Sequence, residues 1–212
     1  MDTVRQKPIL TAAAVGIALV AAVAQYAMPS VVAVLQREPG NGQWWRLVTP
    51  LLVQTLGWYQ VVTNLVTLAL VGVVAERLLG RWRWVVLFAA GTIGGQIAAY
   101  SWQEPGGGDS IAICGLAGGV LVWLLVNRAA RWEVGVAVGY VAALTGWGFG
   151  GIRAAAVAVV IAAVLLHVVP ARVAVGGAVV CAVALAVASD LHGVSLVSGM
   201  AVALLIIRRG RD

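Results

Sequence analysis

A single hydroxyl group stands where a glycine-rich loop meets an apolar segment, at Ser110. The loop is Gly106-Gly107-Gly108-Asp109, and residues 111–126 are almost wholly apolar. A serine at such a boundary is a natural helix N-cap, which is the simpler interpretation. It is also a suitable place for a nucleophile, because the free N–H groups and the dipole of a helix N-terminus stabilise an oxyanion. This stretch alone leaves both interpretations open.

A serine nucleophile needs a base, and histidine supplies one near neutral pH. The chain has two histidines: His192 opens the last apolar segment, whereas His167 falls at the opposite end of another. A histidine near a helix end also serves as an interfacial or capping residue. Gln60 and Asn64 are four residues apart and therefore share one helix face, where a carboxamide N–H can hold an oxyanion. The spans place Ser110, His192, Gln60 and Asn64 at a similar depth below one membrane surface.

The segments that must position these residues are membrane spans. The chain is 62% hydrophobic and 10% charged, with a mean hydropathy of +0.98, which is typical of a polytopic membrane protein. We therefore predict an all-α polytopic transmembrane helical bundle, forming one domain over residues 1–212. Eight apolar segments predict eight spans, with six as the alternative count because several are short. They cover residues 9–27, 57–79, 84–100, 110–126, 134–147, 154–169, 173–188 and 191–207.

Basic residues predict the orientation in the membrane. With the N-terminus inside, only Arg37, Arg46 and Arg153 of the 14 basic residues fall in outer loops. The other 11 are at inner ends: Arg5, Lys7, Arg77, Arg81, Arg83, Arg128, Arg131, Arg172, Arg208, Arg209 and Arg211. This distribution follows the positive-inside rule and places both termini in the cytoplasm. The charges form no single patch, so the net charge of +6 does not indicate a nucleic-acid partner.

We interpret the remaining polar residues as structural. Cys114 and Cys181 lie in apolar segments without a partner motif, so we expect no disulfide framework, no metal and no cofactor. Glu76, next to Arg77, is expected to pack or form a salt bridge at an inner end. Asp109 and Asp190 are expected to be solvated outer-loop acids. A third member of a catalytic triad is the alternative for these acids, but Asp190 is only two residues from His192, a separation from which we do not expect it to reach the ring easily.

Several motifs together are similar to those of a known family. They are Trp45-Arg46, Asn64, Glu76-Arg77-Leu78-Leu79-Gly80-Arg81, Gly108-Asp109-Ser110-Ile111, and His192 with Gly199. In this order, and with consistent topology, they resemble those of the rhomboid intramembrane serine proteases. The resemblance covers roughly residues 44–119 and the last span. It implies an integral protein of the lipid bilayer, and the motif spacing suggests a bacterial plasma membrane.

The resemblance also implies roles for individual residues. Ser110 takes the place of the nucleophile and His192 that of the general base, forming a Ser-His dyad. Asn64 takes the place of an oxyanion-hole side chain, acting with the Ser110 backbone N–H, and Gln60 stands where the family has a histidine. Substrates of the family are typically single-span membrane proteins, cut in or beside the membrane by acyl-enzyme formation. The sequence carries no signal for an oligomeric state.

The sequence departs from the family at several positions near the nucleophile and the base. Gln60 replaces a histidine, Ile111 follows the serine where the family has glycine, Cys114 stands where many members have an aromatic residue, and Ser195 replaces a glycine. These departures favour an alternative, a catalytically inactive rhomboid-like protein that binds transmembrane helices. A transporter or scaffold is a further alternative, but the inner halves of the second and fourth spans carry almost no polar residues to line a solute path.

Overall fold

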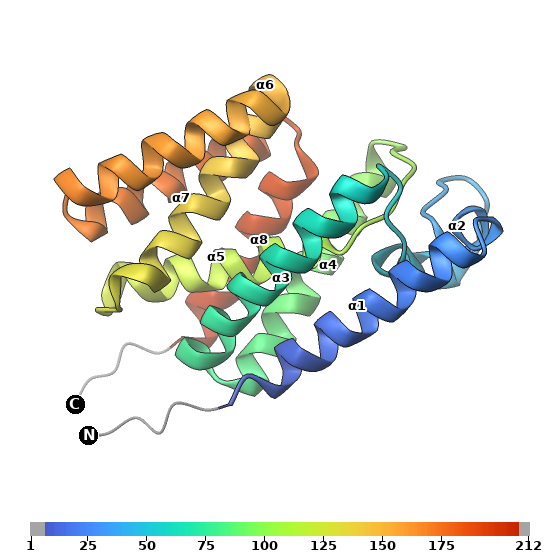
Figure 1. Cartoon of the computed structure of the whole chain (residues 1–212), viewed down its shortest axis with the longest axis horizontal. Coiled ribbons are helices and arrows are strands. Elements are labelled where there is room, and N and C mark those ends of the chain that lie inside the picture. The colour runs from blue at the N-terminus through green and yellow to red at the C-terminus, as the bar shows by residue number, and fades with distance from the viewer. Residues whose placement is uncertain (1–6, 208–212) are drawn as a thin grey trace.

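Apolar sequence dictates helices here, because a backbone segment in hydrocarbon must satisfy its own hydrogen bonds. The computed structural model describes residues 7–207. Its elements are α1 (Ile9–Ala27), α2 (Ser30–Leu35), the 3-10 helices η1 (Trp44–Leu47) and η2 (Thr49–Leu52), α3 (Trp58–Leu79), α4 (Arg81–Ser101), α5 (Ser110–Val126), α6 (Arg131–Val168), α7 (Ala171–Val187) and α8 (Leu191–Ile206). Over residues 7–207 there is no strand, only an isolated bridge between Arg37 and Gly106. The predicted all-α class is confirmed (Figure 1).

Four helices, α1, α3, α4 and α6, are long and apolar enough to cross a membrane. The helices α5, α7 and α8 are apolar but shorter, with 17, 17 and 16 residues. Helix α6 contains a break at Gly151, whose φ of 70° lies in the region that favours glycine. Figure 1 shows its two arms meeting at a sharp bend. The eight predicted segments therefore correspond to α1, α3, α4, α5, the two arms of α6, α7 and α8.

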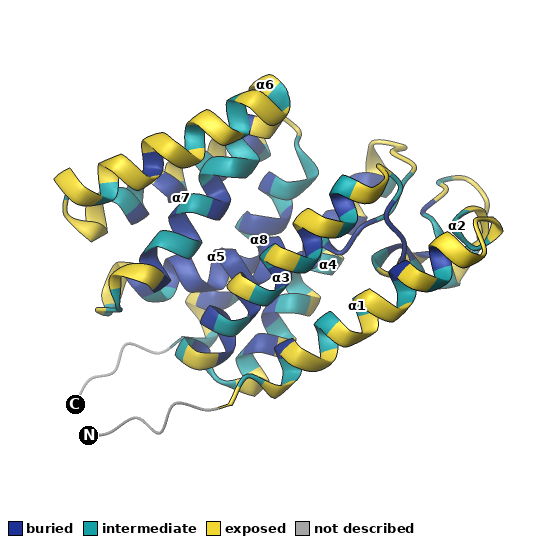
Figure 2. Cartoon of the chain, viewed as in Figure 1, coloured by how far each residue is buried: buried dark blue, intermediate teal, exposed yellow. Residues whose placement is uncertain are grey.

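Helix α5 is the centre of the bundle. It packs against α3, α4, α6, α7 and α8, and 13 of its residues are buried. Figure 2 shows this contrast, with α5 dark along most of its length and the second arm of α6 largely exposed. Exposed apolar side chains on that arm suit a lipid-facing surface. The residue that opens α5 is thus held by the most enclosed helix of the protein.

Three glycines let α4, α5 and α8 approach to backbone contact. A Cβ atom on Gly115 of α5 would lie 2.2 Å from the carbonyl oxygen of Leu87 in α4. On the other side, a Cβ atom on Gly199 of α8 would lie 2.2 Å from the carbonyl oxygen of Gly115. Gly91 of α4 would clash in the same way, 2.5 Å from the Gly115 backbone. Small residues are the usual means of close helix packing in membranes.

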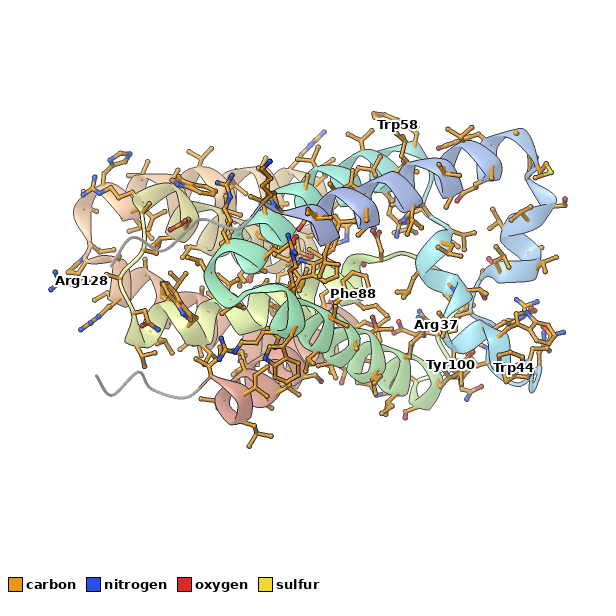
Figure 3. The ribbon with its side chains drawn as sticks, turned by 90° about the horizontal axis from the view of Figure 1, so that it is seen from below. Arg37, Trp44, Trp58, Phe88, Tyr100 and Arg128 are labelled. Atoms are coloured by element: carbon orange, nitrogen blue, oxygen red, sulfur yellow. The ribbon has the colours of Figure 1, made fainter. Side chains whose placement is uncertain are left out.

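The two ends of the bundle are distinguished by their polar contacts. At one end Glu76 accepts hydrogen bonds from the backbone N–H groups of Leu10 and Thr11 and pairs with Arg81 at 3.5 Å. The start of α1, the end of α3 and the start of α4 therefore lie together, and Glu76 pairs with Arg81 instead of its neighbour Arg77. Figure 3 shows Arg128 at the end of the molecule far from Arg37, Trp44 and Tyr100.

The described part of the chain places these charges but not the membrane itself. Arg5, Arg208, Arg209 and Arg211, on which the charge argument partly rests, lie outside residues 7–207. The cytoplasmic position of both termini therefore stays a prediction from the positive-inside rule.

We predict that Gly115→Ala destabilises the bundle, because the new methyl group has no space against the α4 backbone at Leu87 and Gly91. The cost is expected to be about 1–3 kcal/mol, as for other overpacked cores. Thermal unfolding in detergent measures the effect. The matched control is Gly139→Ala in α6, where a Cβ atom meets nothing within 4 Å. Equal melting temperatures for the two variants would contradict the close packing at Gly115.

Candidate active site

The structure brings Ser110 and His192 together although 82 residues separate them. Ser110 is the first residue of α5, and His192 lies in the first turn of α8. The His192 Nε2 atom lies 3.1 Å from the Ser110 Oγ atom, within hydrogen-bond distance. The His192 side chain is 28% exposed, so the pair is not sealed inside the bundle. A hydroxyl and an imidazole in this arrangement have the geometry of a nucleophile and its base.

The expectation that Asp190 does not reach the histidine ring was wrong. Asp190 is the N-cap of α8, and its Oδ1 atom accepts hydrogen bonds from the backbone N–H groups of His192 at 2.8 Å and Gly193 at 3.2 Å. The same oxygen lies 3.1 Å from His192 Nδ1. The ring folds back over the cap because helix α8 begins directly after the aspartate. Asp190 is also half-buried, so it is not a freely solvated acid.

The environment of Asp190 favours its ionised form. Burial acts to raise the pKa of this carboxyl group, but the hydrogen bonds and the charge of His192 and the two backbone N–H groups outweigh it. The net result is a pKa below the usual range. At neutral pH the His192 ring therefore faces a carboxylate.

The glycine-rich loop before Ser110 is held on both sides. Gly106 exchanges two backbone hydrogen bonds with Arg37, at 2.7 and 3.0 Å. The Gly107 N–H donates to Thr55 Oγ1, and the Gly108 N–H donates to the carbonyl oxygen of Pro50. A Cβ atom on Gly107 would lie 2.8 Å from the Val53 carbonyl oxygen, so the loop runs directly against this segment. These contacts fix the point at which α5 begins.

The prediction that Asp109 is solvated was also wrong. The residue is only 4% exposed. Its Oδ1 atom accepts hydrogen bonds from Gln54 Nε2 at 3.0 Å and Asn64 Nδ2 at 2.9 Å. Burial raises the pKa of Asp109 and outweighs the hydrogen bonds from Gln54 and Asn64 that act to lower it. The loop contacts explain the burial, because they press the start of α5 against α3.

The two carboxamides of α3 have different hydrogen-bond partners. The Asn64 Nδ2 atom donates to both Asp109 Oδ1 and Gln54 Oε1, which occupies its two hydrogens. Gln60 Nε2 donates to the Gly107 carbonyl oxygen at 3.0 Å, and within residues 7–207 its second hydrogen has no partner. A Cβ atom on Gly108 would lie 2.5 Å from Gln60 Nε2. Gln60 therefore has the spare donor beside the loop, whereas Asn64 is committed to Asp109.

The backbone N–H groups at the start of α5 are further hydrogen-bond donors beside Ser110. The first backbone N–H groups of the helix that have an acceptor are those of Ala112 and Ile113, which both donate to the Asp109 carbonyl oxygen. Those of Ser110 and Ile111 have no acceptor in the described part of the chain. Free N–H groups at a helix N-terminus are suited to hold an anion.

Two departures from the family pattern have a structural explanation. Ile111 is 4% exposed and lies against α4, since a Cβ atom on Gly95 would meet its Cβ at 2.8 Å. Its bulk is therefore accommodated between helices. The Sγ atom of Cys114 lies 3.4 Å from the hydroxyl group of Tyr140, which also donates to the Ser110 carbonyl oxygen at 3.5 Å. An aromatic residue from α6 thus lies beside the start of α5.

Sequence reasoning missed both Gln54 and Tyr140. The available signal was the same for each, namely a polar group within an otherwise apolar run, at residues 50–56 and 134–147. Polar groups buried in a membrane protein need partners, and these two find them next to Ser110.

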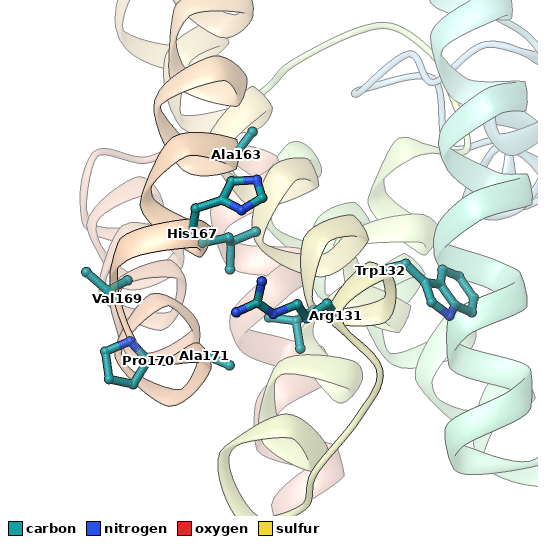
Figure 4. A pocket seen from close by; sticks show the side chains of 9 residues that line it. Arg131, Trp132, Ala163, His167, Val169, Pro170 and Ala171 are labelled. Atoms are coloured by element: carbon teal, nitrogen blue, oxygen red, sulfur yellow. The ribbon is translucent and has the colours of Figure 1, made fainter.

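One cavity of the described chain lies away from this site. It has a volume of about 380 Å³ and is lined by residues that include Arg131, His167 and Pro170, where the end of α6 meets the starts of α6 and α7 (Figure 4). Its lining shares no residue with the Ser110 site. The two histidines therefore belong to separate places. Within residues 7–207 no group of three His, Cys, Asp or Glu side chains is arranged to hold a metal ion.

Comparisons with known proteins bear on this site. The sequence pattern of the Rhomboid domain matches residues 41–209. Rhomboid protease GluP of Bacillus subtilis (strain 168) is 36% identical over 89 residues, which cover 42% of this chain and 17% of that protein. The putative rhomboid protease YdcA of the same organism is 36% identical over 92 residues, covering 42% of this chain and 45% of that protein. The matched stretches thus span less than half of either relative. No solved structure matches the chain.

We predict that Asp109→Asn keeps or raises stability whereas Asp109→Ala lowers it. An asparagine oxygen can still accept from Gln54 and Asn64, and its neutral side chain avoids the cost of burying a charge. Alanine leaves two buried donors without an acceptor, at about 1–3 kcal/mol each. Thermal unfolding in detergent measures both, with the exposed Glu104→Gln as the control. An equal loss for the two variants would refute the prediction.

The stability gained by Asp109→Asn should depend on pH. Because the pKa of Asp109 is raised in the folded state, protonation favours folding, and this contribution is lost as pH rises through the raised pKa. The difference in melting temperature between Asp109→Asn and the unsubstituted protein should therefore shrink in acid. A difference that is constant with pH would show that charge is not its cause.

Proposed function

The chain belongs to the rhomboid family, and we propose that it is an intramembrane serine endopeptidase that cleaves transmembrane or juxtamembrane segments. The observation that carries this proposal is the 3.1 Å contact between Ser110 Oγ and His192 Nε2. Both relatives carry the name rhomboid protease, which for YdcA reads “Putative rhomboid protease”. The proposed catalytic pair is Ser110 and His192.

In the proposed acylation step, Ser110 Oγ attacks the carbonyl carbon of the scissile peptide bond. His192 Nε2 takes the hydroxyl proton as the Oγ–C bond forms, which leaves an oxyanion on the tetrahedral intermediate. His192 then gives this proton to the departing amine, and the acyl group remains on Ser110. A water molecule, activated by the same nitrogen, releases the acyl group. The partial exposure of His192 gives that water a way in.

The proposed oxyanion donors are the backbone N–H groups of Ser110 and Ile111 and the side chain of Gln60. All three have an uncommitted hydrogen in the described chain. Asn64, the other carboxamide that the family resemblance implies, would act only after releasing Asp109 or Gln54. In this structure the Asn64 side chain instead holds Asp109, the last residue of the glycine-rich loop.

The proposed substrate is a single-span membrane protein. The site is at the ends of α5 and α8, where a substrate helix must be extended before its backbone reaches Ser110 Oγ. Small or helix-weakening residues near the cut would lower the cost of that extension. The proposed location is a bacterial plasma membrane, as the two Bacillus subtilis relatives suggest. The charge distribution favours both termini in the cytoplasm.

An inactive helix-binding protein is the second candidate function. The observation that favours it is the engagement of both Asn64 hydrogens, which removes one donor from the oxyanion site. The two candidates differ in whether Ser110 becomes acylated.

We predict that a fluorescent fluorophosphonate labels the detergent-solubilised protein and that Ser110→Ala and His192→Ala abolish the labelling. The first variant removes the nucleophile and the second removes its base. Matched controls are Ser195→Ala, a buried serine of α8, and His167→Ala at the other cavity. Both should label like the unsubstituted protein. An unlabelled protein beside a labelled active rhomboid would favour the inactive helix-binding alternative.

We also predict that Gln60→Ala slows labelling by about 10²–10³-fold, the usual effect of losing an oxyanion donor. Gln60→His, which restores an N–H donor, should recover most of the rate. Labelling time courses at one reagent concentration measure both, and melting temperatures show whether each variant is folded. If Gln60→Ala labels at the original rate while folded, Gln60 is not an oxyanion donor.

A further inference from the structure

We propose that Asp190 is a positioning residue for the base, so that this site works as an Asp190-His192-Ser110 triad instead of a dyad. The inference rests on the proposed function, because it concerns the same nucleophile. It is carried by two distances on either side of one ring, 3.1 Å from Asp190 Oδ1 to Nδ1 and 3.1 Å from Nε2 to Ser110 Oγ.

The first consequence of this geometry is a single tautomer. A carboxylate can only accept a hydrogen bond, so the proton of the neutral ring lies on Nδ1, facing Asp190. The Nε2 atom then carries the lone pair and accepts the Ser110 hydroxyl proton. In the other tautomer, Nε2 would be protonated and unable to act as a base. Asp190 therefore selects the tautomer that the reaction needs.

The second consequence concerns charge. When Ser110 is acylated, its proton moves to Nε2 and the ring becomes an imidazolium with both nitrogens protonated. Asp190 keeps its negative charge and takes no proton, and the Nδ1 proton stays on the ring. Among the described residues Asp190 forms no ion pair with a lysine or arginine. Its charge is thus left to stabilise the imidazolium.

The surroundings hold the carboxylate in this position. The Asp190 backbone N–H donates to the Leu185 carbonyl oxygen at 3.0 Å, and the preceding Ser189 has a φ of 59°, so α7 and α8 are joined by a tight turn. On the other side, a Cβ atom on Gly148 of α6 would lie 3.5 Å from Asp190 Oδ2. Helix α6 thus passes close to the second carboxylate oxygen.

An N-cap alone would explain the two backbone hydrogen bonds of Asp190, so the experiment must separate capping from positioning. Asparagine and serine cap a helix about as well as aspartate, whereas alanine does not. Only an acid supplies the charge. The variants are therefore Asp190→Asn, Asp190→Ser, Asp190→Ala and Asp190→Glu, with Glu104→Gln as the control for losing an exposed acid.

The measurements are the fluorophosphonate labelling rate and the melting temperature in detergent. We expect Asp190→Asn and Asp190→Ser to keep the melting temperature but to label about 10- to 1,000-fold more slowly, the range for removing an opposite charge beside an ionising group. Asp190→Glu should recover part of the rate.

The outcomes separate this inference from the proposed function. If the unsubstituted protein labels through Ser110 and Asp190→Asn and Asp190→Ser label at the same rate, Asp190 is only a cap and the inference is overturned while the protease proposal stands. If the unsubstituted protein does not label at all, the proposed function fails first.

Discussion

Backbone contact at Gly115 is the constraint on which the rest of the site depends. The main chains of α4 and α8 both contact this residue: a Cβ atom on Gly115 would clash with α4, and a Cβ atom on Gly199 of α8 would clash with the Gly115 backbone. Ser110 lies five residues before Gly115 in α5, and His192 lies seven residues before Gly199 in α8. The separation of serine and histidine is therefore set one to two helical turns away from them. A bundle packed through larger side chains would leave the imidazole out of reach of the hydroxyl.

The helices and the shared depth of the polar residues could be predicted from the sequence for a simple physical reason. Hydrocarbon permits few arrangements of backbone, so apolar runs and their charged ends determine where each span begins. Ser110 and His192 each open a span, and Gln60 lies in the first turn of another. Residues at the same ends of packed helices are neighbours in depth. That is how a hydroxyl and an imidazole so distant in sequence could be placed in one layer.

Hydrogen-bond partners could not be predicted in the same way. Asp109 and Asp190 were expected to be solvated because both lie in loops, yet each is held by groups whose positions depend on tertiary packing. Gln54 donates a hydrogen bond to Asp109 only because the segment before α3 packs against the glycine-rich loop. Tyr140 lies in α6, and the spacing of residues in the sequence does not show that this helix packs beside the start of α5. Depth follows from composition, but lateral position within a layer requires the structure.

The shortness of the two central helices has a consequence for the bilayer. Helices α5 and α8 have 17 and 16 residues, about 25 Å of helix, whereas a typical hydrocarbon core is about 30 Å thick. Such a mismatch is relieved by local thinning of the membrane or by tilting of the protein within it. Lipids with shorter acyl chains would lower the cost of that adjustment. The thickness of the surrounding membrane therefore acts on how deeply Ser110 lies beneath the headgroups and, under the proposed function, on how easily a substrate backbone and water arrive there together.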